Sequence, residues 1–583
     1  MQTLRLQRGS AEITVRQRSA AIQDSESTVS TAGGRVRGAA GAFVALAAVF
    51  MAASAGATPA RSGYIVESHS AVSAAAAVRR VGGRVTHELP IINGVSALLT
   101  PAQASRLQKD TALALFTDSQ VVPQGANPII DQYARIEVGA DKLGAQGFFG
   151  NGVTVAILDS GIWASWNDVK NDLSGHNKIL KQYNAITGQV GDSGSSTASD
   201  DYGHGSHIAS IIGSPDTSID GQPQGIAPMA HLVAVKSFDL NGVGSYASVL
   251  NGLNWILANR TTYSIRILNL SFGAKPQSFY WNDPIDQAVM KLWQAGVVVV
   301  ASAGNYGPGA MSITVPGNSP YVITVGAMTD NYTPNNPADD GVTSFSSTGP
   351  TYEGFIKPDL IAPGGHLIGS MNAGTMKIPK EYPAFATANN TMFVMSGTSQ
   401  AAAVVSGVAA LMLQANPALT PDLVKCRVMA SAAGLLNSKG TAAYTVFQQG
   451  MGMVNAYNAV YSQAANCANL GLGIANDIAG TAHYGGPARQ DPTTHNFYVV
   501  DPAGNPMGSD GYLWNQSYAK NLGYLWNQGY LWNQGYLWNS GYLWNSGYLW
   551  NQGYLWNQGY LWNQSTVTPA SAPAAMESWN NQE

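Results

Sequence analysis

Residues 153–162 read Val-Thr-Val-Ala-Ile-Leu-Asp-Ser-Gly-Ile. The residues before the aspartate are apolar or β-branched without alternating, which is typical of a strand buried on both faces of a sheet. Four similar runs follow along the chain, at residues 232–236, 266–270, 297–301 and 321–325. Segments with helical periodicity lie between them, among them 246–258 and 283–294. This alternation predicts an α/β fold with a mostly parallel, doubly wound sheet flanked by helices.

Polar residues follow several of these predicted strands. Asp159 comes directly after the first strand, Ser271 after the third, and Asn305 shortly after the fourth. His204 opens a short apolar helix, and Ser399 stands at the start of a longer one. Because ligands bind beyond the carboxyl ends of strands in such sheets, we expect a carboxylate, an imidazole, a hydroxyl and an amide to meet at one edge.

These groups match the requirements of acyl transfer through a serine. The hydroxyl of Ser399 becomes a good nucleophile when a neutral imidazole, here His204, takes its proton. A carboxylate such as Asp159 fixes the imidazole tautomer and stabilises the imidazolium. The oxyanion needs donors, each worth about 2.7–4 kcal/mol, and Asn305 and the backbone N–H of Ser399 can supply them. Asp200 and Asp201 could compete for the acid role, but their polar loop favours solvated carboxylates.

Four ordered segments resemble the motifs of subtilisin-type serine endopeptidases, the subtilase family. They are VTVAILDSGI at 153–162, DYGHGSHIAS at 201–210, ASAGN at 301–305 and MSGTSQAAAVVSG at 395–407. The resemblance covers residues 132–463 and implies a subtilisin-like fold, with Asp159, His204 and Ser399 as the catalytic triad and Asn305 as the oxyanion donor. His207 is expected to be structural. No cofactor is implied for the chemistry; structural calcium is common in the family, but no dense carboxylate loop locates a metal site here.

The resemblance also implies where substrate binds. In the family, the peptide adds as a strand between two segments of the enzyme, and glycines allow its backbone to come close. One segment here is Gly242, Val243 and Gly244, and the other is Ser271, Phe272 and Gly273. Ala301, Ser302, Ala303 and Gly304 would form a wall of the pocket for the residue before the cut. Gln400 stands where the family usually has methionine, which leaves the reacting atoms in place.

The N-terminal residues 1–57 have the features of a signal peptide. Arginines precede an uncharged, apolar run over 38–60, which ends in the small-residue pattern Ala55-Gly56-Ala57. The alternative is an uncleaved anchor helix, for which the run is just long enough. The small residues favour cleavage, so we expect a secreted protein, extracellular or associated with the cell surface. Export would permit Cys426 and Cys467 to pair, and the sequence leaves open whether their geometry allows it.

Residues 63–122 are expected to form a small α+β unit. This unit is too small to be very stable alone, and an exposed linker follows it. It resembles the inhibitory propeptide of the subtilases, which assists folding and occupies the substrate cleft until it is removed. The resemblance therefore implies a self-processing zymogen whose own propeptide is an intramolecular inhibitor.

The C-terminal part changes in composition. Residues 464–511 are predicted to be a linker, and a polar tail occupies 565–583. Between them, over 512–564, Tyr-Leu-Trp-Asn occurs eight times. The usual spacing of six is even, so all Tyr and Trp side chains would share one face of an extended chain. Such a ladder could bind cell-surface glycans or mediate self-association; the alternative is a low-complexity tail without a fold.

Composition excludes several classes of protein. Only 11% of residues are charged and the formal net charge is −4, so no basic excess supports nucleic-acid binding. Two cysteines exclude a disulfide-rich mini-protein.

A lipase would use the same triad, but its histidine usually comes last, whereas Ser399 is last here. The alternative function is a catalytically inactive adhesin with a protease scaffold. A fluorophosphonate probe would distinguish it from a protease, because labelling at Ser399 would exclude the inactive scaffold.

Overall fold

The computed structural model describes residues 61–500, except 119, 124–133, 219–220, 334–335, 388 and 439, together with 504, 506 and 530–531. The signal peptide expected at 1–57 and the polar tail at 565–583 lie outside the described residues. The repeats at 512–564 also lie outside them, apart from Tyr530 and Leu531.

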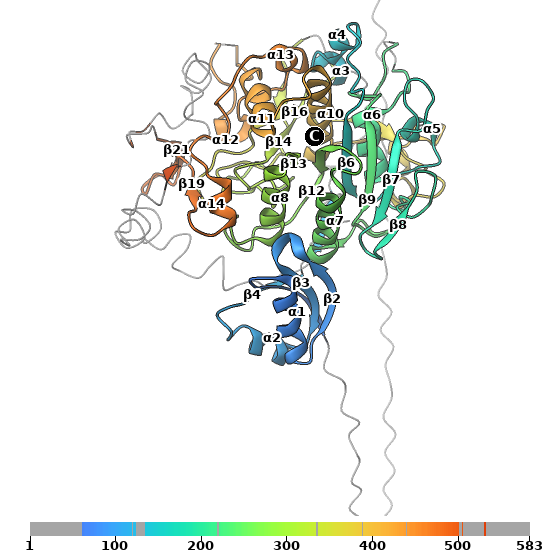
Figure 1. Cartoon of the computed structure of the whole chain (residues 1–583). Coiled ribbons are helices and arrows are strands. Elements are labelled where there is room, and N and C mark those ends of the chain that lie inside the picture. The colour runs from blue at the N-terminus through green and yellow to red at the C-terminus, as the bar shows by residue number, and fades with distance from the viewer. Residues whose placement is uncertain are drawn as a thin grey trace, which may run out of the picture. The chain divides into compact units, whose positions relative to one another are not determined.

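A nine-stranded sheet forms the centre of the fold (Figure 1). The strand order is β15 (Gly341–Val342), β14 (Ile323–Thr329), β13 (Val298–Ser302), β11 (Ile265–Leu270), β6 (Thr154–Asp159), β9 (His231–Lys236), β7 (Ile179–Asn184) and β8 (Gln189–Gly191), with β16 (Leu360–Pro363) also paired to β14. The pairs β14–β15 and β7–β8 are antiparallel, and the other pairs of this sheet are parallel. The predicted mostly parallel sheet is therefore confirmed, and β6, β9, β11, β13 and β14 overlap the five apolar runs of the sequence.

Two pairs of helices pack against this sheet. One pair is α6 (His204–Gly213) and α10 (Thr398–Ala415), and the other is α7 (Tyr246–Asn259) and α8 (Pro284–Gln294). Each member of the second pair begins at a side-chain cap: Ser245 accepts from the backbone N–H of Ser248, and Asp283 accepts from the N–H groups of the first turn of α8. Helix α10 is long and apolar enough to cross a membrane, but 89% of it is buried inside the protein. It is the core helix against which β11, β13, β14 and β16 pack.

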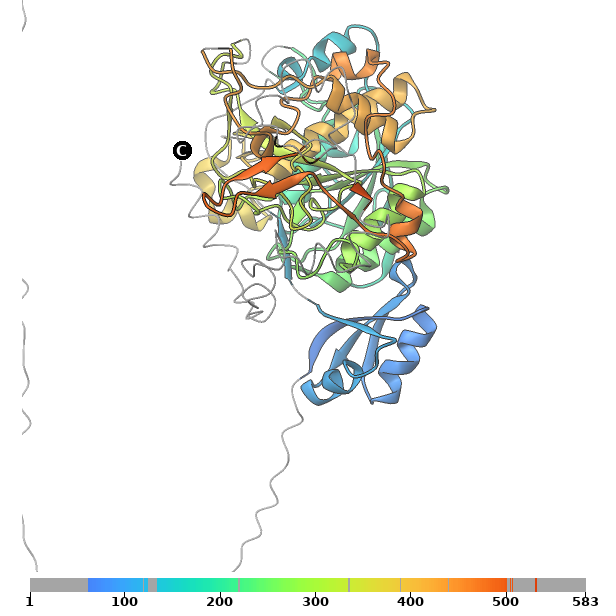
Figure 2. The same cartoon turned by 90° about the vertical axis from the view of Figure 1, so that its left-hand side faces the viewer.

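The N-terminal unit is a separate antiparallel sheet with two helices (Figure 2). Its elements are β1 (Ser62–Glu67), α1 (Ala71–Arg80), β2 (Arg84–Leu89), β3 (Gly94–Leu99), α2 (Pro101–Leu107) and β4 (Ala114–Thr117), and the strand order is β2-β3-β1-β4. Thr100 and Gln103 cap α2 reciprocally, as expected for a hydroxyl residue followed by proline. The unit has a small apolar core of its own, in which Val66, Val78 and Leu99 are buried.

Residues 464–500, which belong to the predicted linker, are folded. They contain α14 (Ile474–Ile478), β19 (Tyr484–Gly485), β20 (Ala488–Gln490) and β21 (Phe497–Val499). A disulfide joins Cys426 to Cys467. The carboxylate of Asp477 accepts hydrogen bonds from the hydroxyls of Tyr280 (2.5 Å) and Tyr321 (2.9 Å), both in the α/β part of the chain. The two-residue strand β19 pairs with Tyr530–Leu531, the segment labelled β22.

Candidate active site

The carboxylate of Asp159 and the imidazole of His204 meet where β6 ends and α6 begins. Asp159 Oδ1 lies 2.8 Å from His204 Nδ1, and both side chains are only 1% exposed. The same oxygen accepts the backbone N–H of Ser160 at 2.7 Å. This contact assigns the proton of the neutral imidazole to Nδ1, because the carboxylate oxygen can only accept. The other nitrogen, Nε2, is therefore available as a base.

Ser399 is the second residue of α10, and α10 packs against α6. The Ser399 hydroxyl donates to the carbonyl oxygen of Ser271 at 3.0 Å, and the Ser271 hydroxyl donates to the carbonyl of Ser399 at 2.8 Å. Among the described residues, His204 Nε2 has no hydrogen-bond partner. The serine and the imidazole are thus not hydrogen-bonded to each other here. If Ser399 acts as the expected nucleophile, its hydroxyl turns from Ser271 towards Nε2; such contacts commonly tighten only when substrate is present.

Asn305 follows β13 and is 3% exposed. Its side-chain oxygen accepts from the backbone N–H of Thr398 at 3.0 Å and from the Thr398 hydroxyl at 2.7 Å. The amide nitrogen Nδ2 is buried and has no partner in the part of the chain that the structure describes. Because the oxygen is held by the residue before Ser399, the amide N–H groups remain available as donors.

A strand from the N-terminal part of the chain lies between the two segments expected to bind substrate. This strand, β5 (Gln120–Pro123), pairs antiparallel with β10 (Gly244–Ser245) and with β12 (Phe272–Gly273). Opposed residues are Gly244 with Val121, Gly273 with Val122, and Phe272 with Pro123. Of the residues expected to bind substrate, Gly244, Phe272 and Gly273 pair with β5. These two segments are therefore spaced to accept one extended peptide between them.

The loop before β10 has a shape that requires glycine. Gly242 has a φ of +71°, and a side chain there would come within 2.4 Å of the ring of Tyr202. Asp239 holds the same loop, since its carboxylate accepts from the N–H groups of Asn241 (2.8 Å) and Val243 (3.0 Å). The hydrogen bonds of Asp239 and the nearby ring of Tyr202 thus restrict the backbone of this loop, which includes the expected substrate-binding residues Gly242 and Val243.

Residues 301–304 lie next to both β12 and the serine helix. The hydroxyl of Ser302 donates to the carbonyl of Phe272 at 3.0 Å. The N–H of Gly304 donates to the hydroxyl of Thr398 at 3.2 Å. Ala301 and Ala303 are fully buried in the same segment. The segment expected to form a wall of the substrate pocket thus lies between β12 and the start of α10.

His207 lies one turn after His204 on α6. Its Nε2 lies 3.2 and 3.1 Å from the carbonyl oxygens of Leu367 and Phe393, so this nitrogen carries the proton. Burial, followed by the charge of His204, lowers the pKa of His207 to about 3. Its other nitrogen, Nδ1, faces the side-chain amide of Gln400 at 3.5 Å. His207 is neutral at ordinary pH and is occupied by structural contacts.

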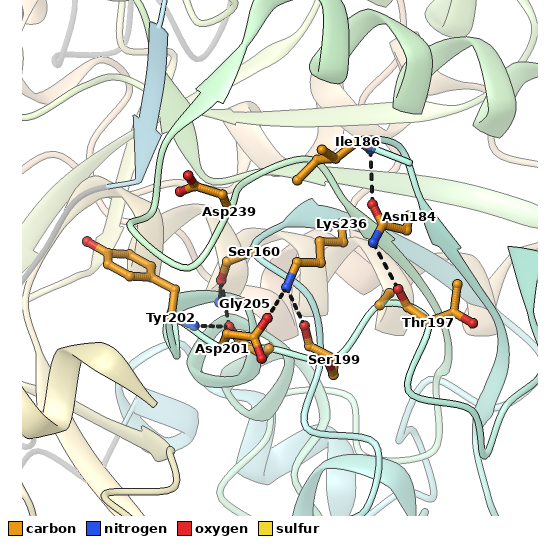
Figure 3. A network of polar contacts seen from close by, with 12 residues as sticks. Ser160, Asn184, Ile186, Thr197, Ser199, Asp201, Tyr202, Gly205, Lys236 and Asp239 are labelled. Carbon is orange, nitrogen blue, oxygen red and sulfur yellow. Dashed lines mark hydrogen bonds and ion pairs between the residues drawn. The ribbon is translucent and has the colours of Figure 1, made fainter. Parts of the chain in front are cut away.

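Asp200 and Asp201 differ, although the sequence predicts solvated carboxylates for both. The Asp201 side chain is 57% exposed and pairs with Lys236 at 2.7 Å, and Lys236 also donates to the carbonyl of Ser199 (Figure 3). Asp200 is only 6% exposed, so the expectation is wrong for this residue. Donors from Ser160 and from the first turn of α6 surround its carboxylate, a convergence that its polar loop sequence does not signal.

Within the described ranges, no group of three or more His, Cys, Asp or Glu side chains could hold a metal ion. No calcium site built from such side chains is therefore assigned in this part of the chain.

Comparisons with known proteins agree with this architecture. The profile of the subtilase family matches residues 150–452. The chain is 38% identical to serine protease AprX of Bacillus subtilis (strain 168) over 283 residues, which cover 47% of this chain and 60% of AprX. It is 31% identical to subtilisin E of the same strain over 376 residues, covering 64% of this chain and 82% of subtilisin E.

A solved structure has a similar fold. Fervidolysin from Fervidobacterium pennivorans, a keratinolytic enzyme related to subtilisin, superposes with a TM-score of 0.55 at 21% identity. The superposition covers 77% of this chain and 68% of fervidolysin.

Proposed function

Since this chain belongs to the subtilase family, we propose that it is a serine endopeptidase that cleaves protein and peptide substrates with Asp159, His204 and Ser399. The observation that carries the proposal is the buried 2.8 Å contact between Asp159 and His204, at the helix that packs against the helix of Ser399. Subtilases need no cofactor for catalysis, and the proposal uses only side chains and backbone of this chain.

The proposed reaction begins when the Ser399 hydroxyl attacks the scissile carbonyl and His204 Nε2 takes its proton. Asp159 stabilises the resulting imidazolium through Nδ1. The amide of Asn305 and the backbone N–H of Ser399 donate to the oxyanion. The imidazolium then protonates the leaving amine, and water, activated by the same imidazole, hydrolyses the acyl-enzyme at Ser399.

We further propose that the protein is a secreted zymogen. Residues 1–57 would direct export, residues 63–122 would be the inhibitory propeptide, and residues 132–463 the peptidase. The position of β5 between β10 and β12 supports an inhibitory role, because this strand fills the slot that substrate needs. Further contacts support the same role: Asp118 accepts the N–H of Ala247 at the start of α7 (2.8 Å), and Asn254 accepts the N–H of Ile91 (3.2 Å).

The test uses the secreted protein produced from the full-length chain and allowed to process. We apply a fluorophosphonate probe to it and measure turnover of a peptide amide. We expect covalent labelling at Ser399 and peptide hydrolysis. Both should be lost in Ser399→Ala and kept in Ser431→Ala, a matched change at the end of a remote helix. Labelling without peptide turnover, but with turnover of simple esters, would indicate an esterase. A chain that does not react with the probe would be the inactive adhesin, which no observation on the described residues favours.

A further inference from the structure

We propose that Asp200 is a positioning residue that joins the segment carrying Asp159 to the helix carrying His204. The assignment rests on the proposed peptidase function, and it concerns a residue outside the triad. The carboxylate touches neither the substrate slot nor the reacting atoms, and it would act through the geometry of the other two side chains.

The first observation is the number of donors that converge on this carboxylate. Oδ1 accepts from the hydroxyl of Ser160 at 2.9 Å and from the N–H groups of Tyr202 at 3.1 Å and Gly203 at 2.7 Å. Oδ2 accepts from the N–H of Ser206 at 2.8 Å and from its hydroxyl at 2.6 Å. All of these partners are donors, so the contacts are made by the ionised form, and charge-assisted hydrogen bonds of this kind are the strong ones.

These donors belong to the two segments that meet at the site. Ser160 directly follows Asp159, and its N–H donates to Asp159 Oδ1. Gly203 and Ser206 flank His204 in the first turn of α6. The buried carboxylate of Asp200 thus holds Ser160, which follows Asp159. It also holds Gly203 and Ser206, which flank His204.

A second hydrogen bond, between Ser160 and Gly205, links the same two segments. The hydroxyl of Ser160 donates to Asp200 and accepts the N–H of Gly205 at 2.9 Å, a contact drawn in Figure 3. A side chain at Gly205 would lie 2.1 Å from the carbonyl oxygen of Gly161 and 3.2 Å from Cβ of Asp159. The segments approach this closely only because glycine occupies position 205, and the carboxylate of Asp200 supplies the hydrogen bonds that keep them there.

Burial makes this arrangement sensitive to substitution. Asp200 is 6% exposed, so a variant that loses the carboxylate leaves several N–H and O–H groups buried without an acceptor. The first turn of α6 would then shift to find new partners. A displacement of about 1 Å at a reacting group can lower a rate by about 100-fold.

The experiment compares Asp200→Asn with Asp201→Asn in the full-length chain after processing. The two carboxylates are adjacent in sequence, but Asp201 is exposed and pairs with Lys236. Active sites are counted by the fluorophosphonate burst, so that misfolded molecules do not enter the rate. We expect kcat per labelled site to fall between about 10- and 100-fold in Asp200→Asn, with KM within twofold of the wild-type value. Asp201→Asn should keep both constants within twofold.

A second variant covers the case in which Asp200→Asn fails to fold. Ser160→Ala removes one donor and leaves the carboxylate in place, and we expect a smaller fall in kcat with KM unchanged. Where both single variants fold, the double variant should lose less than the product of the two single losses, because the residues act through one connection. Unchanged kcat in Asp200→Asn, or in Ser160→Ala where the former does not fold, would overturn the assignment. A wild-type chain without peptide turnover would instead overturn the proposed function and the assignment together.

Discussion

Asn305 and Thr398 are joined by two hydrogen bonds to one oxygen. The side-chain oxygen of Asn305 accepts both the backbone N–H of Thr398, at 3.0 Å, and its hydroxyl, at 2.7 Å. Thr398 immediately precedes the proposed nucleophile, so the pair sets the direction of the Asn305 amide relative to Ser399. The amide nitrogen is left as a buried donor without a partner among the described residues.

We therefore expect Asn305→Ala to lower kcat by about 100- to 1,000-fold with little change in KM, because the lost donor acts mainly on the transition state. The measurement is steady-state hydrolysis of a peptide amide per labelled active site. Thr398→Val is the comparison: it removes one of the two anchoring bonds and the acceptor of the Gly304 N–H, but it keeps the donor, so its effect should be smaller. Equal kcat values in Asn305→Ala and the wild type would exclude the oxyanion role.

The register of β5 predicts the position of self-processing. Pro123 pairs with Phe272 in an antiparallel arrangement. A substrate strand in this register would place the residue after the one paired with Phe272 opposite Ser271. The carbonyl of Ser271 is the group that holds the Ser399 hydroxyl in this structure. We expect cleavage between Gln124 and Gly125.

Mass spectrometry of the purified mature chain checks this expectation. The N-terminal residue should be Gly125, and Ser399→Ala should remain uncut when it is produced alone. A mature N-terminus well downstream, beyond residue 131, would show that β5 marks an inhibitory position rather than the processing point.

Glu67 makes the contact between the N-terminal unit and α8 dependent on pH. It is 8% exposed, one oxygen lacks a partner within the described ranges, and the other is 3.4 Å from the amide of Gln287. Burial, and then the charge of Asp283, raise the pKa of Glu67 to about 8 from an ordinary value of 4.5, while Lys291 acts in the opposite direction. The docked state therefore favours the protonated carboxyl.

Docking of the N-terminal unit is expected to weaken as the pH rises. Because the pKa is higher in the docked state, docking is strongest below about pH 4.5 and weakens as the pH rises towards 8, by about tenfold per pH unit between those limits. We expect the processed N-terminal unit to dissociate faster at pH 7.5 than at pH 6.5, measured as the delay before peptidase activity appears. Glu67→Gln should largely remove this dependence, and His87→Gln should not. The same dependence in Glu67→Gln as in the wild type would assign it to another group.

Asp477 makes residues 464–500 part of the stable fold. Its carboxylate accepts from the hydroxyls of Tyr280 and Tyr321 and lies 2.7 Å from Nδ1 of His483. Both tyrosines lie in the apolar core. Asp477→Ala leaves the Tyr321 hydroxyl without this acceptor and the Tyr280 hydroxyl with only the carbonyl of Tyr484 at 3.4 Å, and it should lower the free energy of unfolding by about 2–4 kcal/mol. Urea unfolding in a Ser399→Ala background measures this without autolysis. Thr493→Ala, on an exposed turn of the same segment, should change stability by less than about 0.5 kcal/mol.

The parts of the fold that follow from local sequence could be predicted. The strand ending in Asp159 is apolar or β-branched at every preceding position, and the helix starting beside Ser399 is rich in alanine and valine. Parallel strands place their carboxyl ends at one edge, which is why residues 45 and 240 positions from Asp159 could be expected at one site. The contact of Asp159 with His204 is present, whereas the roles of Ser399 and Asn305 remain predictions.

Features that depend on convergence in space could not be predicted. Asp200 is buried because donors from β6 and α6 meet around it, and its own loop sequence is as polar as that of the exposed Asp201. Residues 464–500 are rich in Ala, Asn and Gly, a composition shared by linkers and by irregular folded segments. Their order comes from a few long-range contacts, above all the disulfide and Asp477.

The place of β5 between β10 and β12 has a consequence for what this protein can digest. Pairing of this kind engages main-chain N–H and C=O groups, which a helix or an interior strand of a target has already committed to its own fold. We expect a target to become cleavable only after a stretch of it unravels. Resistance to this enzyme would then follow the local opening free energy of the target more closely than its amino-acid composition.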